Sequence, residues 1–146
     1  RGLGDVYKRQ RQAINKETNN RLKPQDAQFL ETDDGPAWLY PGLKLIGCKN
    51  EHKVLNGCWY TIAEIGDRLH LIGEKGEEVA LSWEHAKKTI TLAHAMTIHK
   101  SQSRTLEGHV RICPGNKPGE VSPHFTLRHL LVAASRATCI ENLSIE

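Results

Sequence analysis

Aromatic residues, long apolar runs and paired cysteines are scarce or absent in this sequence, and each absence narrows what the protein can be. Aromatic side chains make up 5% of the 146 residues, so we expect a core built mainly from aliphatic side chains. No apolar run approaches the roughly 20 residues of a membrane-spanning helix. Residues 1–11 are polar and basic and lack the apolar centre of a signal peptide. The sequence therefore predicts a protein that stays outside the membrane.

The four cysteines are scattered and include no C-x-x-C pair, which is typical of reduced thiols in an intracellular protein. We expect such a location, whether cytoplasmic, nuclear or viral. Eight histidines are also present, but no spacing of histidines and cysteines supports a zinc site, so no metal ligand is predicted. The cysteines are Cys48, Cys58, Cys113 and Cys139.

Charge is unevenly distributed along the chain, although the net charge of the whole sequence is only +3. Residues 1–23 hold seven Lys/Arg against two Asp/Glu, residues 24–86 hold five against eleven, and residues 87–146 hold eight against four. The two ends are therefore basic and the middle is acidic. If the protein binds a polyphosphate, we expect the ends to contact it and the middle not to.

The first two thirds of the chain predict one helix followed by short antiparallel strands. Residues 12–22 have the composition of a helix that Pro24 ends. Asn56-Gly57 predicts a two-residue hairpin with a type I′ turn, because both residues tolerate positive φ. We expect the strands to form a small antiparallel barrel. The strands are predicted at 43–48, 59–65, 68–72 and 79–82.

After residue 88 the pattern changes to strand, loop, strand, helix and strand, which is typical of a parallel α/β sheet. The helix is predicted at 126–137, where apolar residues repeat with a period of 3.6. The strands are predicted at 89–95, 109–113 and 140–145. We expect residues 12–39 and 89–146 to form an α/β lobe and residues 40–88 to form a β insert within it. Residues 1–10 show no helical or strand period. We interpret residues 1–11 as a leader or a fragment boundary, which need not belong to the native protein.

Five hydrogen-bonding side chains follow the strand predicted at 89–95. In parallel α/β sheets ligands gather at the carboxyl ends of strands, and hydroxyl, imidazole, ammonium and amide groups there suit the phosphates and sugars of nucleic acid. A helix start capped by Thr97 or Ser101 explains the same residues. The two interpretations are compatible, because helix N-termini bind phosphates. The five residues are Thr97, His99, Lys100, Ser101 and Gln102.

Arg136 lies at the end of the predicted apolar helix and also has two interpretations. A cation at a helix C-terminus is favoured by the helix dipole and can be inert. Alternatively, a guanidinium held on a rigid helix can grip phosphate oxygens with two donors.

Two of these stretches resemble motifs of a known family. Residues 95–102 (Ala-Met-Thr-Ile-His-Lys-Ser-Gln) and 105–107 (Thr-Leu-Glu) resemble motif V of superfamily 1 helicases of the RecD and Pif type. Residues 131–137 (Leu-Val-Ala-Ala-Ser-Arg-Ala) resemble their motif VI. Residues 11–15, with Asn19 and Leu22, are more weakly similar to the motif IV region. The order and spacing also fit.

The resemblance implies a fold for nearly the whole chain after residue 10. The second RecA-like lobe of these helicases carries an SH3-like barrel inserted before motif V, where the β insert is predicted here. The implied fold is therefore a partial RecA-like lobe of the P-loop NTPase type, with a parallel sheet, interrupted by a small SH3-like antiparallel β-barrel.

The resemblance also implies roles for individual residues. Arg136 is expected to act as an arginine finger on the γ-phosphate of ATP bound between two lobes. Arg11, or its neighbour Arg9, is expected to be a second phosphate sensor. Gln102 and Glu107 are expected on the nucleotide side. Single-stranded DNA is expected to contact Thr97, His99, Lys100, Ser101 and Gln102.

Two departures from the family pattern bear on this expectation. Ser103 stands where the family usually has glycine after the glutamine, and Arg104 follows it. The sequence also contains no G-x-x-x-x-G-K-[ST], so ATP and Mg²⁺ are expected to be held by an N-terminal RecA-like lobe that is missing here. We expect the C-terminal motor lobe of an ATP-dependent DNA helicase, inactive alone. The alternative is a non-enzymatic nucleic-acid or protein binding module derived from such a lobe.

Overall fold

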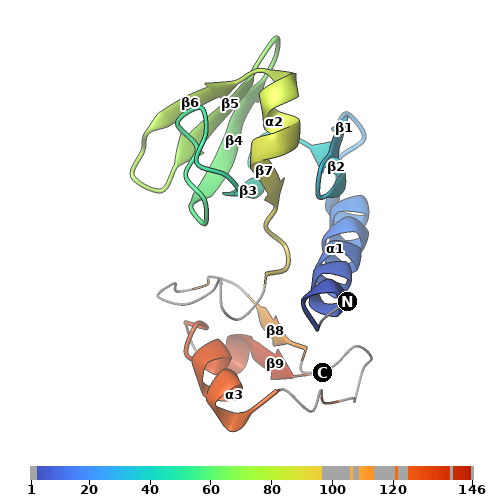
Figure 1. The fold of residues 1–146 in the computed structure, drawn as a ribbon, viewed down its shortest axis with the longest axis vertical. Helices are drawn as coiled ribbons and strands as arrows, with labels where there is room; N and C mark the ends of the chain where they lie inside the picture. The colour runs from blue at the N-terminus through green and yellow to red at the C-terminus, as the bar shows by residue number, and fades with distance from the viewer. Residues whose placement is uncertain are drawn as a thin grey trace. The chain divides into compact units, whose positions relative to one another are not determined.

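The computed structural model divides the chain into two compact units, Arg1–Ala95 and Met96–Glu146 (Figure 1). The residues that the structure describes are 3–96, 106, 109–113, 121, 125–138 and 140–145. The first unit combines helices with antiparallel strands, and the described part of the second combines a helix with a small parallel sheet. The predicted mixture of helix and strand is therefore confirmed.

Helix α1 (Leu3–Leu22) opens the first unit and ends before Pro24, as predicted. Its last turn is closed by a hydrogen bond from the Lys23 amide to the Asn19 carbonyl, at 3.0 Å. The helix begins at Leu3 rather than at residue 12, so the prediction of a segment without helical structure is wrong from Leu3 onward. Adding a residue to a helix that is already nucleated costs little free energy. The added residues therefore need no regular spacing of apolar side chains, and the sequence shows none there.

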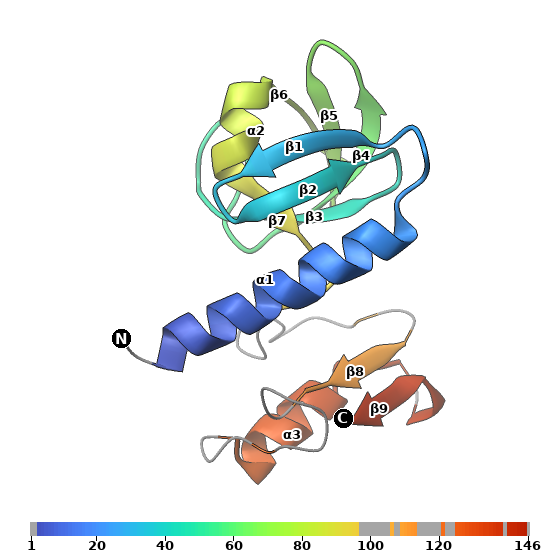
Figure 2. The same ribbon diagram turned by 90° about the vertical axis from the view of Figure 1, so that its right-hand side faces the viewer.

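An antiparallel hairpin follows the helix and packs against it (Figure 2). It consists of β1 (Gln28–Thr32) and β2 (Gly35–Leu39), which meet at a turn formed by Asp33 and Asp34. Alternate residues Leu30, Ala37 and Leu39 are buried on its inner face.

Five antiparallel strands form the main sheet, in the order β6-β5-β4-β3-β7. Four of them fall where the strands of the insert are predicted, so these predictions are confirmed. The described pairings leave β6 and β7 as edges and do not close a ring of strands, so the SH3-like barrel stays a prediction. The strands are β3 (Lys44–Gly47), β4 (Trp59–Ile65), β5 (Leu69–Gly73), β6 (Glu78–Leu81) and β7 (Ile90–Leu92).

Strand β7 belongs to this antiparallel sheet, although the sequence predicts it within the parallel lobe. It pairs with β3, with Thr91 opposite Ile46. All three residues of β7 are buried, and a short apolar run of this kind does not reveal the direction of its partner. The chain reaches β7 through α2 (Trp83–Thr89), a helix that the sequence analysis missed. Its N-cap is Ser82, whose hydroxyl accepts a hydrogen bond from the His85 amide at 3.3 Å.

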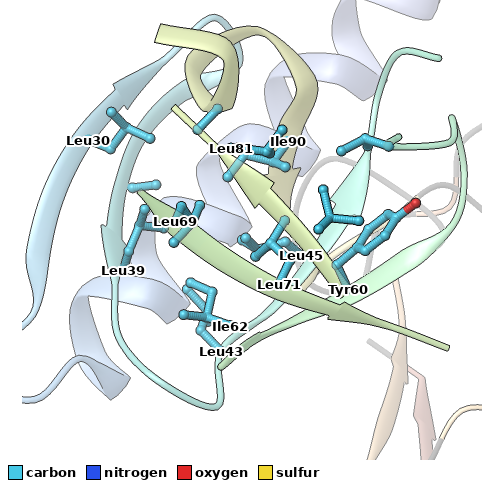
Figure 3. Packing of buried hydrophobic residues seen from close by; sticks show 14 of the residues in the cluster. Leu30, Leu39, Leu43, Leu45, Tyr60, Ile62, Leu69, Leu71, Leu81 and Ile90 are labelled. Atoms are coloured by element: carbon cyan, nitrogen blue, oxygen red, sulfur yellow. The ribbon is translucent and has the colours of Figure 1, made fainter. Parts of the chain in front are cut away.

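The core of the first unit is mainly aliphatic, as the low aromatic content predicts. Leu45, Ile62 and Leu71 of its sheet belong to the same buried cluster as the hairpin residue Leu39 (Figure 3). Tyr60 is the one aromatic side chain among the described residues that is fully buried in this cluster. Its hydroxyl accepts a hydrogen bond from the Leu55 amide at 2.9 Å, which satisfies the one polar atom that Tyr60 brings into the core.

A turn forms at Asn56-Gly57 as predicted, closed by a hydrogen bond from the Cys58 amide to the Leu55 carbonyl at 3.2 Å, but its predicted type I′ geometry is wrong. Among the described residues, positive φ angles occur at Gly57 but not at Asn56, which is the pattern of a type II turn. Two consecutive positive φ angles occur instead at His52 (53°) and Lys53 (70°). The residues on either side, Glu51 and Val54, exchange two backbone hydrogen bonds.

Gly47 at the end of β3 lies in close contact with the Asn56-Gly57 turn. Its amide donates to the Cys58 carbonyl at 2.9 Å, and its carbonyl accepts from the Gly57 amide at 2.8 Å. A Cβ at Gly47 would collide with the backbone carbonyl of Leu55. The Asn56-Gly57 turn therefore packs against the end of β3, and that contact replaces a local hairpin.

The second unit contains the predicted strand–helix–strand arrangement. Strand β8 (Val110–Ile112) pairs in parallel with β9 (Leu143–Ile145), and α3 (Leu127–Ala134) lies between them in the sequence. A short 3₁₀ helix, Ile140–Asn142, replaces the first half of the last predicted strand. The parallel character of this sheet is confirmed. Over the parts of the chain that the structure describes, no helix is both long and apolar enough to cross a membrane.

Candidate functional site

Arg136 lies just beyond the C-terminal end of α3, where its guanidinium folds back onto the helix. Its Nε donates to the Val132 carbonyl at 3.1 Å, and its Nη2 donates to the Ser135 hydroxyl at 2.9 Å. These bonds satisfy a carbonyl at the helix end and hold a positive charge at the negative end of the helix dipole. The two hydrogen bonds hold the guanidinium against the C-terminal end of α3.

The backbone of Arg136 is joined to the segment that resembles motif V. The Leu106 amide donates to the Arg136 carbonyl at 2.6 Å, and Leu106 forms a parallel bridge with Ala137. The fold thus brings the end of the motif V-like sequence to the arginine of the motif VI-like sequence. The predicted residues Thr97, His99, Lys100, Ser101, Gln102 and Glu107 lie outside the described residues.

Arg11, the predicted second phosphate sensor, forms a two-point ion pair with Asp34. Its Nη1 and Nη2 donate to the two carboxylate oxygens at 2.8 and 2.7 Å. The same carboxylate accepts hydrogen bonds from Gln12, at 3.1 Å, and from the Thr91 hydroxyl. Asp34 therefore joins α1 to β7, and in this structure it neutralises the guanidinium that was predicted to contact phosphate.

The ion pair shifts the pKa of both partners. Burial raises the pKa of the Asp34 carboxyl, but hydrogen bonds from Arg11, Thr91 and Gln12 outweigh burial and lower it to about 2. The hydrogen bond to Asp34 raises the pKa of Arg11 further above its ordinary value, against the opposing effect of burial. Both groups are therefore charged at neutral pH.

Replacing Asp34 with asparagine is expected to lower the free energy of unfolding by roughly 2 kcal/mol at pH 7. A carboxyl whose pKa is lower in the folded state stabilises the fold above its unfolded pKa of about 4. That stabilisation is lost as the pH falls from about 4 to about 2. Urea unfolding between pH 2 and pH 7 measures the effect.

The control for this experiment is Asp33→Asn, because Asp33 is the exposed neighbour in the same loop. It should keep the acid-dependent loss of stability that Asp34→Asn removes. Equal unfolding curves for the two variants over this pH range would show that the Asp34 ion pair does not stabilise the unit.

A pocket of about 350 Å³ lies beside this ion pair, between α1, the hairpin and β7. Besides Asp34, which is paired with Arg11, its lining includes the carboxylates of Glu31 and Asp33 against the single lysine Lys16. A wall with this excess of negative charge repels phosphate groups. The pocket therefore does not suit a nucleotide or a nucleic-acid backbone, in line with the acidic middle of the sequence.

Two buried asparagines on α1 were similar to the motif IV region in sequence, but no role was predicted for them. Asn15 and Asn19 are 3% and 1% exposed. Each side chain binds both the amide and the carbonyl of one residue, Ala95 and Trp38 respectively. The sequence could have singled them out as a pair. Asparagine is unfavourable inside a helix, and four-residue spacing places both side chains on one face.

His94, next to Ala95, was also missed. Its Nε2 is buried and has no hydrogen-bond partner among the described residues. Burial, and to a lesser extent the positive charge of Arg21, lower the pKa of His94, which keeps the imidazole neutral. Within the part of the chain that the structure describes, no three His, Cys, Asp or Glu side chains gather where a metal ion could be held.

The fold resembles that of solved Pif1 helicases, which belong to superfamily 1. A crystal structure of Bacteroides Pif1 bound to ssDNA matches with a TM-score of 0.65 and 19% identity, over 91% of this chain and 38% of that chain. Pif1 helicases studied for DNA unwinding at forked dsDNA match with a TM-score of 0.64 and 20% identity, over 91% and 36%. Bacteroides Pif1 in complex with ADP-AlF3 and ssDNA matches with a TM-score of 0.60 and 18% identity, over 99% and 38%.

These matches, at 18–20% identity, concern the fold. The chain spans less than two fifths of the length of the solved helicases that it matches. Its sequence matches no protein-family model and no curated protein.

Proposed function

We propose that this chain is the C-terminal motor lobe of an ATP-dependent DNA helicase. The observation that carries the proposal is the hydrogen bond between Leu106 and Arg136, at 2.6 Å. It joins the end of a sequence expected to contact single-stranded DNA to an arginine expected to contact nucleotide. A direct backbone link of this kind can transmit a conformational change between the DNA contact and the nucleotide contact.

In this proposal residues 12–39 and 89–146 form the RecA-like lobe, and residues 40–88 form an SH3-like insert. Thr97, His99, Lys100, Ser101 and Gln102 contact the DNA backbone. The fold shared with Pif1 helicases supports this assignment, because structures of those proteins are described as bound to ssDNA.

The chain's own residues fit one side of an ATP site. Arg136 offers a guanidinium on a rigid helix end, which suits phosphate oxygens, with Gln102 and Glu107 proposed beside it. The glycine-rich cradle for the remaining phosphates and the carboxylate for Mg²⁺ are assigned to a second lobe. Bound ATP supplies the free energy of the cycle. Arg136 would stabilise charge on the transferring phosphate, and Arg11, which is paired with Asp34 in this structure, is the proposed second sensor.

A second candidate is a non-enzymatic binding module derived from such a lobe, with nucleic acid or protein as its partner. The ion pair between Arg11 and Asp34 favours it, because a paired guanidinium has its two-point grip already occupied. The coding sequence upstream separates the two candidates. A P-loop motif in frame supports the helicase, and a start codon near residue 10 supports the module.

The purified chain is expected to bind a labelled oligo-dT strand weakly and with strong dependence on salt. Single strands lose affinity with a slope of about −0.7 in log–log form for each phosphate contact. Three contacts therefore predict about a 20-fold loss between 50 and 200 mM salt. Fluorescence anisotropy across a salt series measures it. An affinity that does not change with salt would mean that the ligand is of another kind.

Two lysine variants separate specific contact from general attraction. Lys100→Ala should reduce the slope by about 0.7, the value of one contact. Lys87→Ala is the matched control, because Lys87 is an exposed lysine in the last turn of α2. If both variants change the slope equally, the contact cannot be assigned to residues 97–102.

A further inference from the structure

Asn15 holds the residue at which the first unit ends. Its side-chain oxygen accepts from the Ala95 amide at 2.7 Å, and its side-chain nitrogen donates to the Ala95 carbonyl at 3.2 Å. Ala95 lies beyond the end of β7 at Leu92, so no strand ladder satisfies these two backbone groups. The Asn15 amide thus takes the place of a neighbouring strand at this position.

Two further contacts fix the part of α1 that carries Asn15. Arg11, Asn15 and Asn19 follow one another at four-residue spacing and therefore share one face of the helix. Arg11 is tied through Asp34 to Thr91 of β7, and Asn19 binds both backbone groups of Trp38 at 2.7 and 2.9 Å. The helix is anchored on both sides of Asn15, which makes Asn15 a fixed point of attachment.

The chemistry of Asn15 favours this role over a contribution to helix stability. Asparagine competes with the helix backbone for hydrogen bonds and is a weak helix former. At 3% exposure, a leucine would bury more apolar surface on the same face. What asparagine offers here is a donor and an acceptor at the spacing of a peptide group.

We propose that Asn15 is a positioning residue. It fixes the backbone at Ala95, from which the chain continues into residues 97–102, the segment proposed to contact DNA. Only Met96 separates Ala95 from Thr97 in the sequence. The inference rests on the proposed function for the role of residues 97–102, and on the hydrogen bonds of Ala95 for the role of Asn15. A change at Asn15 should therefore act on that segment without touching DNA.

The chain offers a matched control, because Asn19 forms the same pair of bonds with Trp38 in the hairpin. Asn15→Ala and Asn19→Ala each lose two buried hydrogen bonds and should lower the unfolding midpoint to a similar extent. Asn15→Ala should weaken binding of labelled oligo-dT about tenfold, a typical effect of losing roughly one well-placed contact. Asn19→Ala should keep the affinity of the unchanged chain. Equal losses in the two variants, or none in either, would overturn the proposal.

A second measurement tests the positioning without DNA. Trypsin cleavage after Lys100 should be several-fold faster in Asn15→Ala than in Asn19→Ala, at a temperature where circular dichroism shows both folded. Equal cleavage rates would overturn the role of Asn15. If the unchanged chain does not bind oligo-dT, the proposed function fails, while the cleavage comparison still decides the positioning role.

If the alanine variants do not fold, the same cleavage measurement can be made on aspartate variants, which change the side chain less. Asn15→Asp keeps an acceptor for the Ala95 amide and loses the donor to its carbonyl, and Asn19→Asp makes the same change at Trp38. The same difference in cleavage after Lys100 is expected between these two variants, and its absence counts against the proposal in the same way.

Discussion

Replacing Arg136 with alanine is expected to lower the kcat of ATP hydrolysis by about 10³–10⁵-fold in a protein that joins this lobe to a P-loop lobe. An arginine finger acts on charge that develops in the transition state, so its loss changes kcat far more than nucleotide affinity. Affinity for single-stranded DNA should change little. Steady-state ATPase assays with and without DNA measure the first effect, and anisotropy measures the second.

Two other variants make this result specific. Arg128→Ala removes an exposed arginine from the first turn of the same helix and should leave kcat unchanged. Arg136→Lys keeps the charge but loses the two-point fork, so its kcat should remain well below that of the unchanged protein.

Arg136→Ala also removes hydrogen bonds to Val132 and Ser135, so a thermal melt must show that the variant is folded. An outcome in which DNA affinity collapses while ATP turnover survives would assign Arg136 to the wrong ligand. That result would favour the binding module over the motor lobe.

The double change His99→Ala with Gln102→Ala is expected to weaken single-strand binding roughly 100-fold, or to uncouple it from ATP hydrolysis. Each side chain is proposed to donate a hydrogen bond to a phosphate, and a bond to a charged group contributes about 1.5 kcal/mol or more. Two such losses correspond to about two powers of ten in affinity. Anisotropy with oligo-dT measures the affinity, and the DNA dependence of ATP turnover in the two-lobe protein measures the coupling.

The matched control is His70→Ala with Gln28→Ala, which removes the same two side-chain types from exposed positions in the first unit. It should leave both affinity and coupling intact. Unchanged binding and coupling in the His99 and Gln102 variant would contradict the assignment of residues 97–102 to DNA.

Most of the local structure could be predicted from the sequence. Alternating apolar residues located β4 and β5, Pro24 located the end of α1, and the 3.6 period located α3. These signals are local, because the period of the side chains and the missing amide of proline act on neighbouring residues. The prediction of a type I′ hairpin failed at Asn56-Gly57, where the turn is of another type and packs against Gly47 of β3.

The candidate site could be predicted in part. The sequence singled out Arg136 and its helix, and the structure adds that Leu106 is bonded to its backbone. It also singled out Arg11, but it did not single out Asp34. A carboxylate in a turn has no sequence signal for the guanidinium that it will bind, because the pairing depends on how α1 lies against the hairpin.

The sequence by itself determined most of the strands and the helix α3, the acidic middle between two basic ends, and the two motif-like stretches on which the proposed function rests. Only the tertiary structure decided which groups meet. Arg11 reaches Asp34 across 23 residues, Thr91 reaches it across 57, and Asn15 reaches Ala95 across 80. Such contacts form when buried polar groups must find partners inside a packed unit. That requirement is not visible in the spacing of residues along the chain.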